Sequence, residues 1–201
     1  MDTWNIKGHT LEYLDKQHMY LVDGVIVPSI TTLIKAILKG KYDGVDKEIL
    51  KRASEKGTEM HQIIQDYEEY GIDDIGSTEL HNYKFLKKQF KWKCLKNELP
   101  IIIFDEKGKA IAAGRLDMVI EMNGNIGLAD LKRTATLDIN YLTYQLNAYR
   151  IGYQQCYDDE IKFLKGIHLR EDKRKFVDIK INEEKVRELL YGQNNIRWTK
   201  W

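Results

Sequence analysis

Cysteine and proline are scarce in this sequence, with two of each among 201 residues, and long apolar runs are missing. Cys94 and Cys156 stand alone, without a CxxC pair, so the pattern indicates neither a disulfide framework nor a structural zinc or iron–sulfur site. The longest apolar runs, such as residues 100–104, are far shorter than the roughly 20 residues that a membrane helix needs. Residues 1–8 lack the basic and then apolar layout of a signal peptide, so we expect a cytoplasmic protein with no membrane partner.

A strong net charge is also missing, because 32 Lys and Arg nearly balance 31 Asp and Glu. Whole-molecule charge therefore does not indicate a nucleic-acid binder. Local charge is uneven, since residues 81–97 contain six lysines and no acid, whereas residues 66–79 contain six acids. On a helix, four of these lysines share one side: Lys84, Lys87, Lys88 and Lys91. They form either an ordinary amphipathic surface helix or a rail for phosphates.

Length and composition predict one domain, and residue patterns predict its elements. Helices are expected at about 29–38, 47–70, 81–97 and 140–156, with a last helix opened by Asn182; strands are expected at 10–14, 18–22, 25–27, 101–105, 114–122, 126–133, 166–170 and 176–181. The apolar stripe of the second helix runs from Leu50 to Tyr67. The order of helix, three strands, helix and strand predicts an α/β fold of the α+β kind, with a mixed sheet flanked by helices.

The dipeptide Asn123-Gly124 is a strong hairpin signal between two of these strands. A two-residue loop pairs Met122 with Asn125, and counting outward from this pair places Asp117 directly opposite Asp130. A bulge at Gly127 would shift this register.

Opposed side chains have Cβ atoms about 4.5–5.5 Å apart, where two like charges destabilise the sheet. Strand alternation places Asp117, Asp130 and Lys132 on the same side. A divalent cation would offset the repulsion, which predicts a magnesium site for phosphate chemistry; the alternative is a surface salt-bridge cluster. One helical turn after Gly57, His61 is either a further metal ligand or an ordinary core histidine.

These residues resemble the PD-(D/E)XK nuclease superfamily, in the branch of the RecB nuclease domain, the CRISPR adaptation nucleases and the lambda-type phage exonucleases. Asp117 matches the first aspartate of the motif, although Leu116 replaces the proline, and residues 130–132 match the (D/E)XK half. Three further matches complete the pattern: a GxxxH helix at residues 57–61, a QxxxY helix with Gln145 and Tyr149, and a PSVTT-like segment at residues 28–33. The resemblance covers about residues 28–153.

The resemblance implies a restriction-endonuclease-like core with the order αβββαβ at residues 28–181, between an N-terminal hairpin region (1–27) and a C-terminal helix and tail (182–201). It implies Mg²⁺ or Mn²⁺ held by His61, Asp117, Asp130 and the Leu131 carbonyl, with Glu98 as a loose match to a further ligand. Lys132 would position the attacking water, and Gln145 and Tyr149 would help to hold the site. An iron–sulfur cluster, which several relatives hold with four cysteines, is not expected.

Three functions follow from the resemblance. The first is a metal-dependent DNA exonuclease in the replication, recombination or repair of a phage or bacterial genome. The second is a nuclease fold that only binds nucleic acid or a protein, as a defence or anti-defence factor, and the third is a structure-specific or sequence-specific endonuclease. The expected partners are DNA, a second copy of the chain, or a recombination protein of phage or host. DNA contacts are expected from the lysine helix, Arg115 and Arg133, while Trp198 and Trp201 near the end of the sequence could stack on bases or pack on the body.

Overall fold

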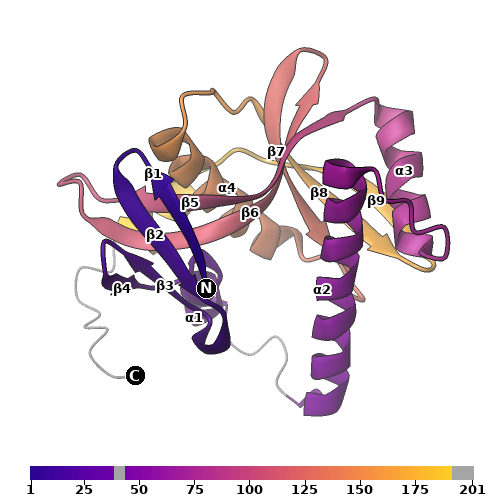
Figure 1. The fold of residues 1–201 in the computed structure, drawn as a ribbon, viewed down its shortest axis with the longest axis horizontal. Coiled ribbons are helices and arrows are strands. Elements are labelled where there is room, and N and C mark those ends of the chain that lie inside the picture. Colours follow the sequence, from indigo (N-terminus) through magenta and orange to yellow (C-terminus); the bar gives the residue numbers. More distant parts are fainter. Residues whose placement is uncertain (39–43, 192–201) are drawn as a thin grey trace.

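The computed structural model describes residues 1–38 and 44–191. The chain has a mixed α/β fold, in which an antiparallel four-stranded sheet lies beside a mixed five-stranded sheet and helices cover both faces of the larger sheet (Figure 1). Trp198 and Trp201, which were expected to stack on bases or pack on the body, lie outside the described residues. Most of the loop expected between the first two helices lies outside them as well. Within the described part of the chain, no helix has both the length and the apolar character needed to cross a membrane.

The four-stranded sheet has the order β1-β2-β3-β4 and consists of β1 (Asp2–Ile6), β2 (His9–Leu14), β3 (Met19–Val22) and β4 (Val25–Val27). Asp23 and Gly24 form the turn between β3 and β4, and both residues have the positive φ values of a tight hairpin turn. A short 3-10 helix (Asp15–Gln17) separates β2 from β3. Strand β1 was not predicted, because the segment alternates weakly and gains its partners only from β2.

The five-stranded sheet has the order β5-β6-β7-β8-β9, formed by β5 (Lys93–Phe104), β6 (Ala110–Met122), β7 (Asn125–Lys132), β8 (Phe163–Arg170) and β9 (Lys173–Ile179). All neighbours are antiparallel except β7 and β8, which are parallel. Helix α4 (Ile139–Cys156) provides the crossover that a parallel pair requires. The predicted mixed sheet flanked by helices is therefore confirmed.

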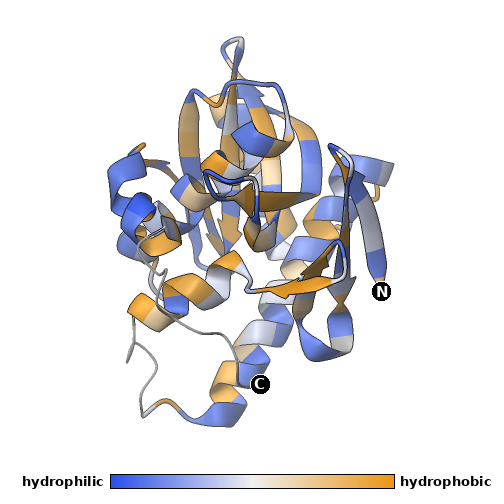
Figure 2. Cartoon of the chain, turned by 90° about the vertical axis from the view of Figure 1, so that its left-hand side faces the viewer, coloured by the Kyte–Doolittle hydropathy of each residue, from blue (hydrophilic) through white to orange (hydrophobic). Residues whose placement is uncertain are grey.

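Each face of this sheet packs against its own group of helices. Helices α1 (Ile30–Ile37), α4 and α5 (Glu183–Tyr191) share one hydrophobic cluster with Val119 and Leu128. Helices α2 (Lys47–Tyr70) and α3 (Thr78–Phe90) share the other cluster with Met118 and Ile120. The central strands are accordingly hydrophobic over long stretches, as the orange segments in Figure 2 show. Since both faces are buried, β6 and β7 do not have the one solvent-facing side that a half-buried strand would have.

Helix α2 has the predicted bounds but only half of the predicted packing. Its first turn is capped by the Asp46 carboxylate, which accepts a hydrogen bond of 2.7 Å from the Glu48 N–H, and it ends at Gly71 with φ 69°. The expected apolar stripe is buried at Met60 and Ile64, whereas the first three turns of the helix are mostly exposed. The N-terminal half of α2 therefore extends away from the sheet (Figure 1).

The lysine-rich helix is shorter than predicted. Helix α3 ends at Phe90, and Lys91 adopts the left-handed φ of 57° that often follows a helix. Trp92 is buried and stacks on Phe176 with ring centroids 4.5 Å apart, so the chain leaves the helix to pack this ring. The prediction that the helix continues toward Pro100 was wrong, because from Lys93 onward the residues pair with β6 as strand β5.

Candidate metal centre

The hairpin that was expected to fix the site has the predicted register. Asn123 and Gly124 have φ values of 52° and 75°, and the β6–β7 pairs run from Met122–Asn125 to Met118–Ala129. There is no bulge at Gly127, which lies opposite Ile120. A side chain at Gly127 would collide with the Phe163 ring, since a Cβ there would be 2.3 Å from it.

Asp117 and Asp130 do not form the directly opposed ladder pair that was expected. The ladder ends at Met118–Ala129, one pair earlier, and the Asp117 Oδ2 atom accepts a hydrogen bond of 2.7 Å from the Leu131 N–H. The strands separate here because the carboxylate replaces a backbone carbonyl as the acceptor for that N–H. This contact fixes the Asp117 side chain at the point where the two strands diverge.

Asp130 is completely buried beside Lys132. Its Oδ2 atom forms an ion pair with the Lys132 Nζ, and its Oδ1 atom has no hydrogen-bond partner among the described residues. Burial and the Asp117 carboxylate raise the pKa of Asp130 to about 7, although Lys132 opposes this rise. The pKa of Lys132 is raised as well, because Asp130 and Asp117 outweigh the burial of its ammonium group. A buried carboxylate oxygen without a partner, as Asp130 Oδ1 is among the described residues, is a position that a cation can complete.

Glu98 lies opposite Asp117 on the other neighbouring strand. The flanking pairs Asn97–Met118 and Leu99–Leu116 define this position, after a bulge at Leu95 shifts the β5–β6 register by one residue. Glu98 has a positive φ of 46°, which is uncommon for a residue with a side chain. Its Oε2 atom lies 2.7 Å from the Arg115 Nε, so an ion pair holds the carboxylate in place.

His61 lies on α2, which packs on the sheet, and its imidazole ring lies close to the Glu98 and Asp117 carboxylates. Its Nε2 atom lies 3.2 Å from the Leu131 carbonyl oxygen, while its Nδ1 atom lies 3.5 Å from Glu98 Oε1 and 3.8 Å from Asp117 Oδ1. Burial opposes a charge on the imidazole, but the two carboxylates outweigh it and raise the pKa of His61 to about 9. Ligand atoms of His61, Glu98 and Asp117 all lie within 4.8 Å of one another.

This geometry resembles that of metal-binding histidines, which commonly donate one ring N–H to a backbone carbonyl and offer the other nitrogen to the metal. The Leu131 carbonyl, expected as a ligand, accepts the His61 Nε2–H here. Nδ1, which faces both carboxylates, is then the nitrogen that can bind a cation.

Gln145 and Tyr149 lie one turn apart on α4, and their side chains contact each other. The Gln145 Nε2 donates to the Tyr149 hydroxyl at 3.4 Å, and the Gln145 Oε1 is buried without a hydrogen-bond partner among the described residues. Burial and the Asp117 charge raise the pKa of Tyr149. Tyr149 packs on Gly114, where a Cβ would lie 3.0 Å from its ring, so this glycine allows α4 to approach the site closely.

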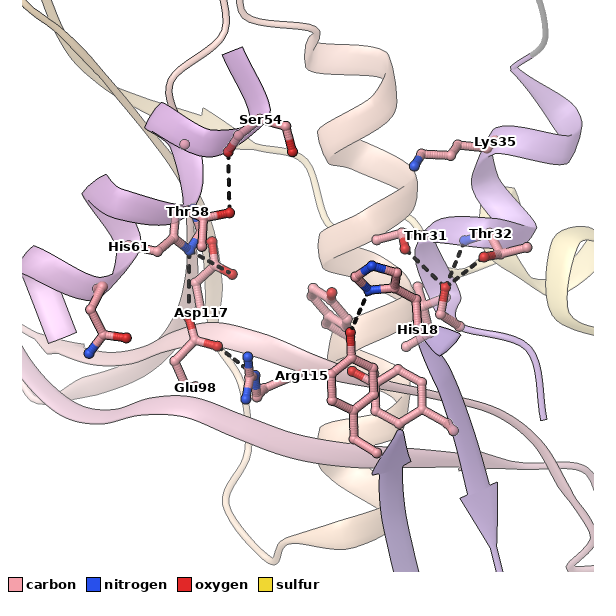
Figure 3. Close-up of a pocket in the computed structure, with 18 of the residues that line it drawn as sticks. His18, Thr31, Thr32, Lys35, Ser54, Thr58, His61, Glu98, Arg115 and Asp117 are labelled. Atoms are coloured by element: carbon pink, nitrogen blue, oxygen red, sulfur yellow. Dashed lines mark hydrogen bonds and ion pairs between the residues drawn. The ribbon is translucent and has the colours of Figure 1, made fainter. Parts of the chain in front are cut away.

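A cleft of about 680 Å³ leads from the surface to this cluster (Figure 3). His61 and Thr58 lie on one side of it, His18 and Lys35 lie on the other, and Glu98 and Asp117 lie on strands β5 and β6 at its base. Tyr13 and Tyr20 of the N-terminal sheet, and His18 in the link before β3, also line the cleft and were not predicted. No motif marks these residues, and they reach the cleft only because the two sheets pack together.

Most of the basic residues expected to contact DNA lie elsewhere and are paired with acids. Lys84 Nζ is 2.6 Å from Asp73, and Lys87 Nζ is 2.6 Å from Glu68. Arg133 contacts both Glu79 and Glu171. Among the cleft-lining residues, Arg115 is the one member of the predicted DNA-binding set; the others, Lys84, Lys87, Lys88, Lys91 and Arg133, do not line it.

Comparisons with known proteins do not assign this chain to a family. No protein-family model matches the chain, and no curated protein matches it. A solved structure titled "Crystal structure of SSO0001" is similar over 80% of each chain, with 19% sequence identity and a TM-score of 0.38.

Proposed function

We propose that this protein is a metal-dependent nuclease that hydrolyses phosphodiester bonds in DNA, built on a restriction-endonuclease-like core. The observation that carries the proposal is the cluster of His61, Glu98 and Asp117 beside the buried Asp130–Lys132 ion pair. The five residues come from α2, β5, β6 and β7, and they meet where β6 and β7 separate.

The donor set fits Mg²⁺ or Mn²⁺. Hard cations prefer carboxylate oxygens, which Glu98, Asp117 and Asp130 supply, and an imidazole nitrogen favours acceptance of Mn²⁺ as well. The Asp130 Oδ1 atom has no hydrogen-bond partner among the described residues, and the pKa values of Asp130 and His61 are raised. In such a cluster, protons partly compensate for crowded negative charge. When bound, the cation would lower the pKa of a water molecule and polarise the phosphate.

The chain's own groups would orient the reactants. Lys132 is held by Asp130, so its ammonium group is fixed beside the carboxylates and can offset negative charge that develops on phosphate oxygens. Asp117 is fixed by the Leu131 N–H, and the Leu131 carbonyl fixes His61. Positions that depend on backbone contacts need little reorganisation during the reaction, which is the basis of electrostatic preorganisation.

The test is the degradation of end-labelled linear DNA and closed circular DNA with Mg²⁺, Mn²⁺ or a chelator. We expect metal-dependent loss of linear DNA, reduced at least about 100-fold by Asp117→Asn and by Lys132→Met. Asp117→Asn keeps an oxygen that can accept the Leu131 N–H, so the loss would reflect the missing charge. The matched control is Lys165→Met, because Lys165 also lies buried in an ion pair, with Asp178, but outside the cluster.

The other functions give different results in the same assay. Cutting of closed circles would indicate an endonuclease. Binding of DNA without cleavage under any metal condition would indicate a binding module and would contradict the proposal.

A further inference from the structure

The last three residues of β7 carry the Asp130–Lys132 ion pair but have a strand ladder along one edge only. Among the described residues, the ladder to β6 stops at Ala129, whereas the parallel ladder to β8 continues to Lys132, which pairs with His168. A strand end that is paired on one side has fewer backbone contacts to hold it. The position of the Lys132 ammonium group therefore depends on β8 and on the residues that directly follow β7.

Arg133 is the first of these residues, and two acids hold its side chain. Its Nε atom lies 2.6 Å from Glu79 Oε1 at the start of α3, and its Nη2 atom forms an ion pair with Glu171 in the turn between β8 and β9. Successive side chains of an extended strand point to opposite faces, which places this anchor behind the sheet as seen from Lys132. The guanidinium is thus bound to carboxylates of the protein.

Both acids belong to segments that are joined to each other. The Asn82 side chain of α3 is buried and donates a hydrogen bond of 2.9 Å to the carbonyl oxygen of Arg170, the residue before Glu171. Arg133 therefore binds two parts of one connected frame, α3 and the β8–β9 turn. An arginine fits this position because its planar guanidinium can bind two carboxylates at once, which the single ammonium group of a lysine does poorly.

The same β8–β9 hairpin holds the two residues after Arg133. The His168 Nε2 atom lies 2.6 Å from the Thr134 carbonyl oxygen, and the Lys173 Nζ donates to the Ala135 carbonyl oxygen at 2.9 Å. Three successive residues after β7 are therefore fixed, and Arg133 is the one nearest to the strand end.

The Arg133–Glu79 contact differs from an ordinary surface ion pair. The side chains of Arg133 and Glu79 are 10% and 14% exposed, so water screens their attraction little. Glu171 is 51% exposed and contributes less. Removing one partner of a shielded pair leaves the other charge without compensation, so we assign most of the anchoring to the pair with Glu79.

We propose that Arg133 is a positioning residue for Lys132, on which it acts by tying the end of β7 to α3 and to the β8–β9 turn. The inference rests on the proposed nuclease function, in which the Lys132 ammonium group offsets charge on phosphate oxygens. Misplacing a reacting group by about 1 Å can lower a rate by about 100-fold, so a loose strand end would slow the reaction even with every metal ligand present. Arg133 serves the reaction from behind the sheet, without touching DNA.

The test measures kcat and KM for cleavage of labelled linear DNA with Mn²⁺. We expect Arg133→Met to lower kcat about 10- to 100-fold while KM stays within about twofold, because Arg133 does not line the cleft. The Mn²⁺ affinity should be unchanged, since Glu79 and Glu171 are not candidate ligands. The control is Arg150→Met, which removes an arginine of 13% exposure from an ion pair with Glu183 and should keep the wild-type kcat.

A second background separates positioning from general support of the fold. In the Lys132→Met protein, the further change Arg133→Met should leave the residual kcat within about twofold, because no ammonium group remains to be displaced. Equal fold losses in both backgrounds would overturn the inference. Glu79→Gln is a milder variant that keeps Arg133, and it should lower kcat at least about threefold with KM unchanged. Wild-type kcat in the folded Arg133→Met and Glu79→Gln proteins would overturn the inference as well.

Amide hydrogen exchange tests the anchoring without cleavage. Arg133→Met should speed exchange at residues 130–132 at least about tenfold, and Arg150→Met should not. No cleavage by the wild-type protein with any metal would reject the nuclease function, whereas unchanged exchange in Arg133→Met would reject the anchoring role. The two failures are therefore read from different measurements.

Discussion

Arg115 links the N-terminal sheet to the carboxylates of the candidate metal centre. Its Nε lies 2.7 Å from Glu98, its Nη1 lies 3.6 Å from Asp2, and its guanidinium lies 6.0 Å from the centre of the Tyr13 ring. Glu98 has a backbone conformation that residues with side chains rarely adopt. The ion pair therefore contributes to holding Glu98, a candidate metal ligand with a strained backbone, in position.

Replacing Arg115 should weaken metal binding without removing a ligand. We expect Arg115→Leu to lower the Mn²⁺ affinity about 10-fold, since partners that orient a metal ligand commonly contribute 10- to 100-fold. Isothermal titration calorimetry measures this change. Arg187→Leu removes an exposed arginine that pairs with Glu183 on α5, and its affinity should equal that of the wild type. An unchanged affinity in Arg115→Leu would show that Glu98 holds its position without this partner.

The titratable groups of the cluster predict how the stability of the metal-free protein depends on pH. The folded-state pKa is raised for both His61 (to about 9) and Asp130 (to about 7), so the folded state binds more protons than the unfolded chain. The His61 contribution is complete below about pH 6.5 and is lost as the pH rises through about 9; the Asp130 contribution is lost as the pH rises through about 7. The free energy of unfolding should fall by at least about 1 kcal/mol between pH 6 and 9.

Urea unfolding in the presence of a chelator measures this dependence. His61→Gln should make the upper part of the curve, above about pH 7, flatter. With saturating Mn²⁺ the trend should reverse, because the metal displaces the same protons and binds more tightly as the pH rises. A metal-free protein that gains stability from pH 6 to 9 would contradict the assigned pKa shifts.

Gly57 and Gly152 both lie inside helices, but a Cβ atom would meet open space at Gly57 and close neighbours at Gly152. Gly57→Ala should raise the free energy of unfolding by about 0.5–1 kcal/mol, because the helix gains propensity and the new Cβ meets nothing. Gly152→Ala on α4 should lower it by about 1–3 kcal/mol, because a Cβ there would lie 2.9 Å from Ile101 Cδ1 and 3.3 Å from the Ile102 carbonyl oxygen. Urea unfolding of the two variants makes each the control for the other. Two changes of the same sign would contradict the packing described for one of these helices.

Local signals account for the elements that the sequence predicted well. Helix α2 has a capping aspartate and a terminal glycine, and the Asn123-Gly124 turn determines the register of β6 and β7. The features that the sequence did not predict depend on contacts between segments that are distant along the chain. The burial of Trp92 against Phe176 ends α3 early, and the bulge at Leu95 brings Glu98 opposite Asp117. His61 and Asp117 could be selected from motifs, but the cleft that joins them to Tyr13 and His18 could not, because it exists only between two packed sheets.

At the scale of the whole molecule, opposite charges are largely paired on the side of α2 and α3, and the cleft holds few cations. If DNA enters the cleft, Lys35 and Arg115 are the main lysine and arginine contacts, with His18 nearby. For single-stranded DNA the logarithm of the affinity falls with the logarithm of the salt concentration, with a slope of about 0.7 per neutralised phosphate. We therefore expect a shallow slope of about −1.5 to −2 in an anisotropy titration of a cleavage-deficient Asp117→Asn protein.

The lysine helix supplies the contrasting outcome. In the Asp117→Asn protein, the further double change Lys88→Ala and Lys91→Ala should leave the affinity for single-stranded DNA within about twofold. These two residues do not line the cleft. Lys35→Ala should reduce the affinity and the salt slope together. A steep slope that Lys88→Ala and Lys91→Ala abolish would instead place the phosphate path on α3.

His61, Glu98 and Asp117 of the candidate metal centre belong to α2, β5 and β6, respectively. These segments lie far apart along the chain. A cation held by all three would act as a reversible crosslink that the unfolded chain cannot form. Ligands that bind only the folded state stabilise it by about 2.7 kcal/mol at 100 times their dissociation constant. A thermal-shift titration with Mn²⁺ would therefore report occupancy of the centre by itself, before any substrate has been identified.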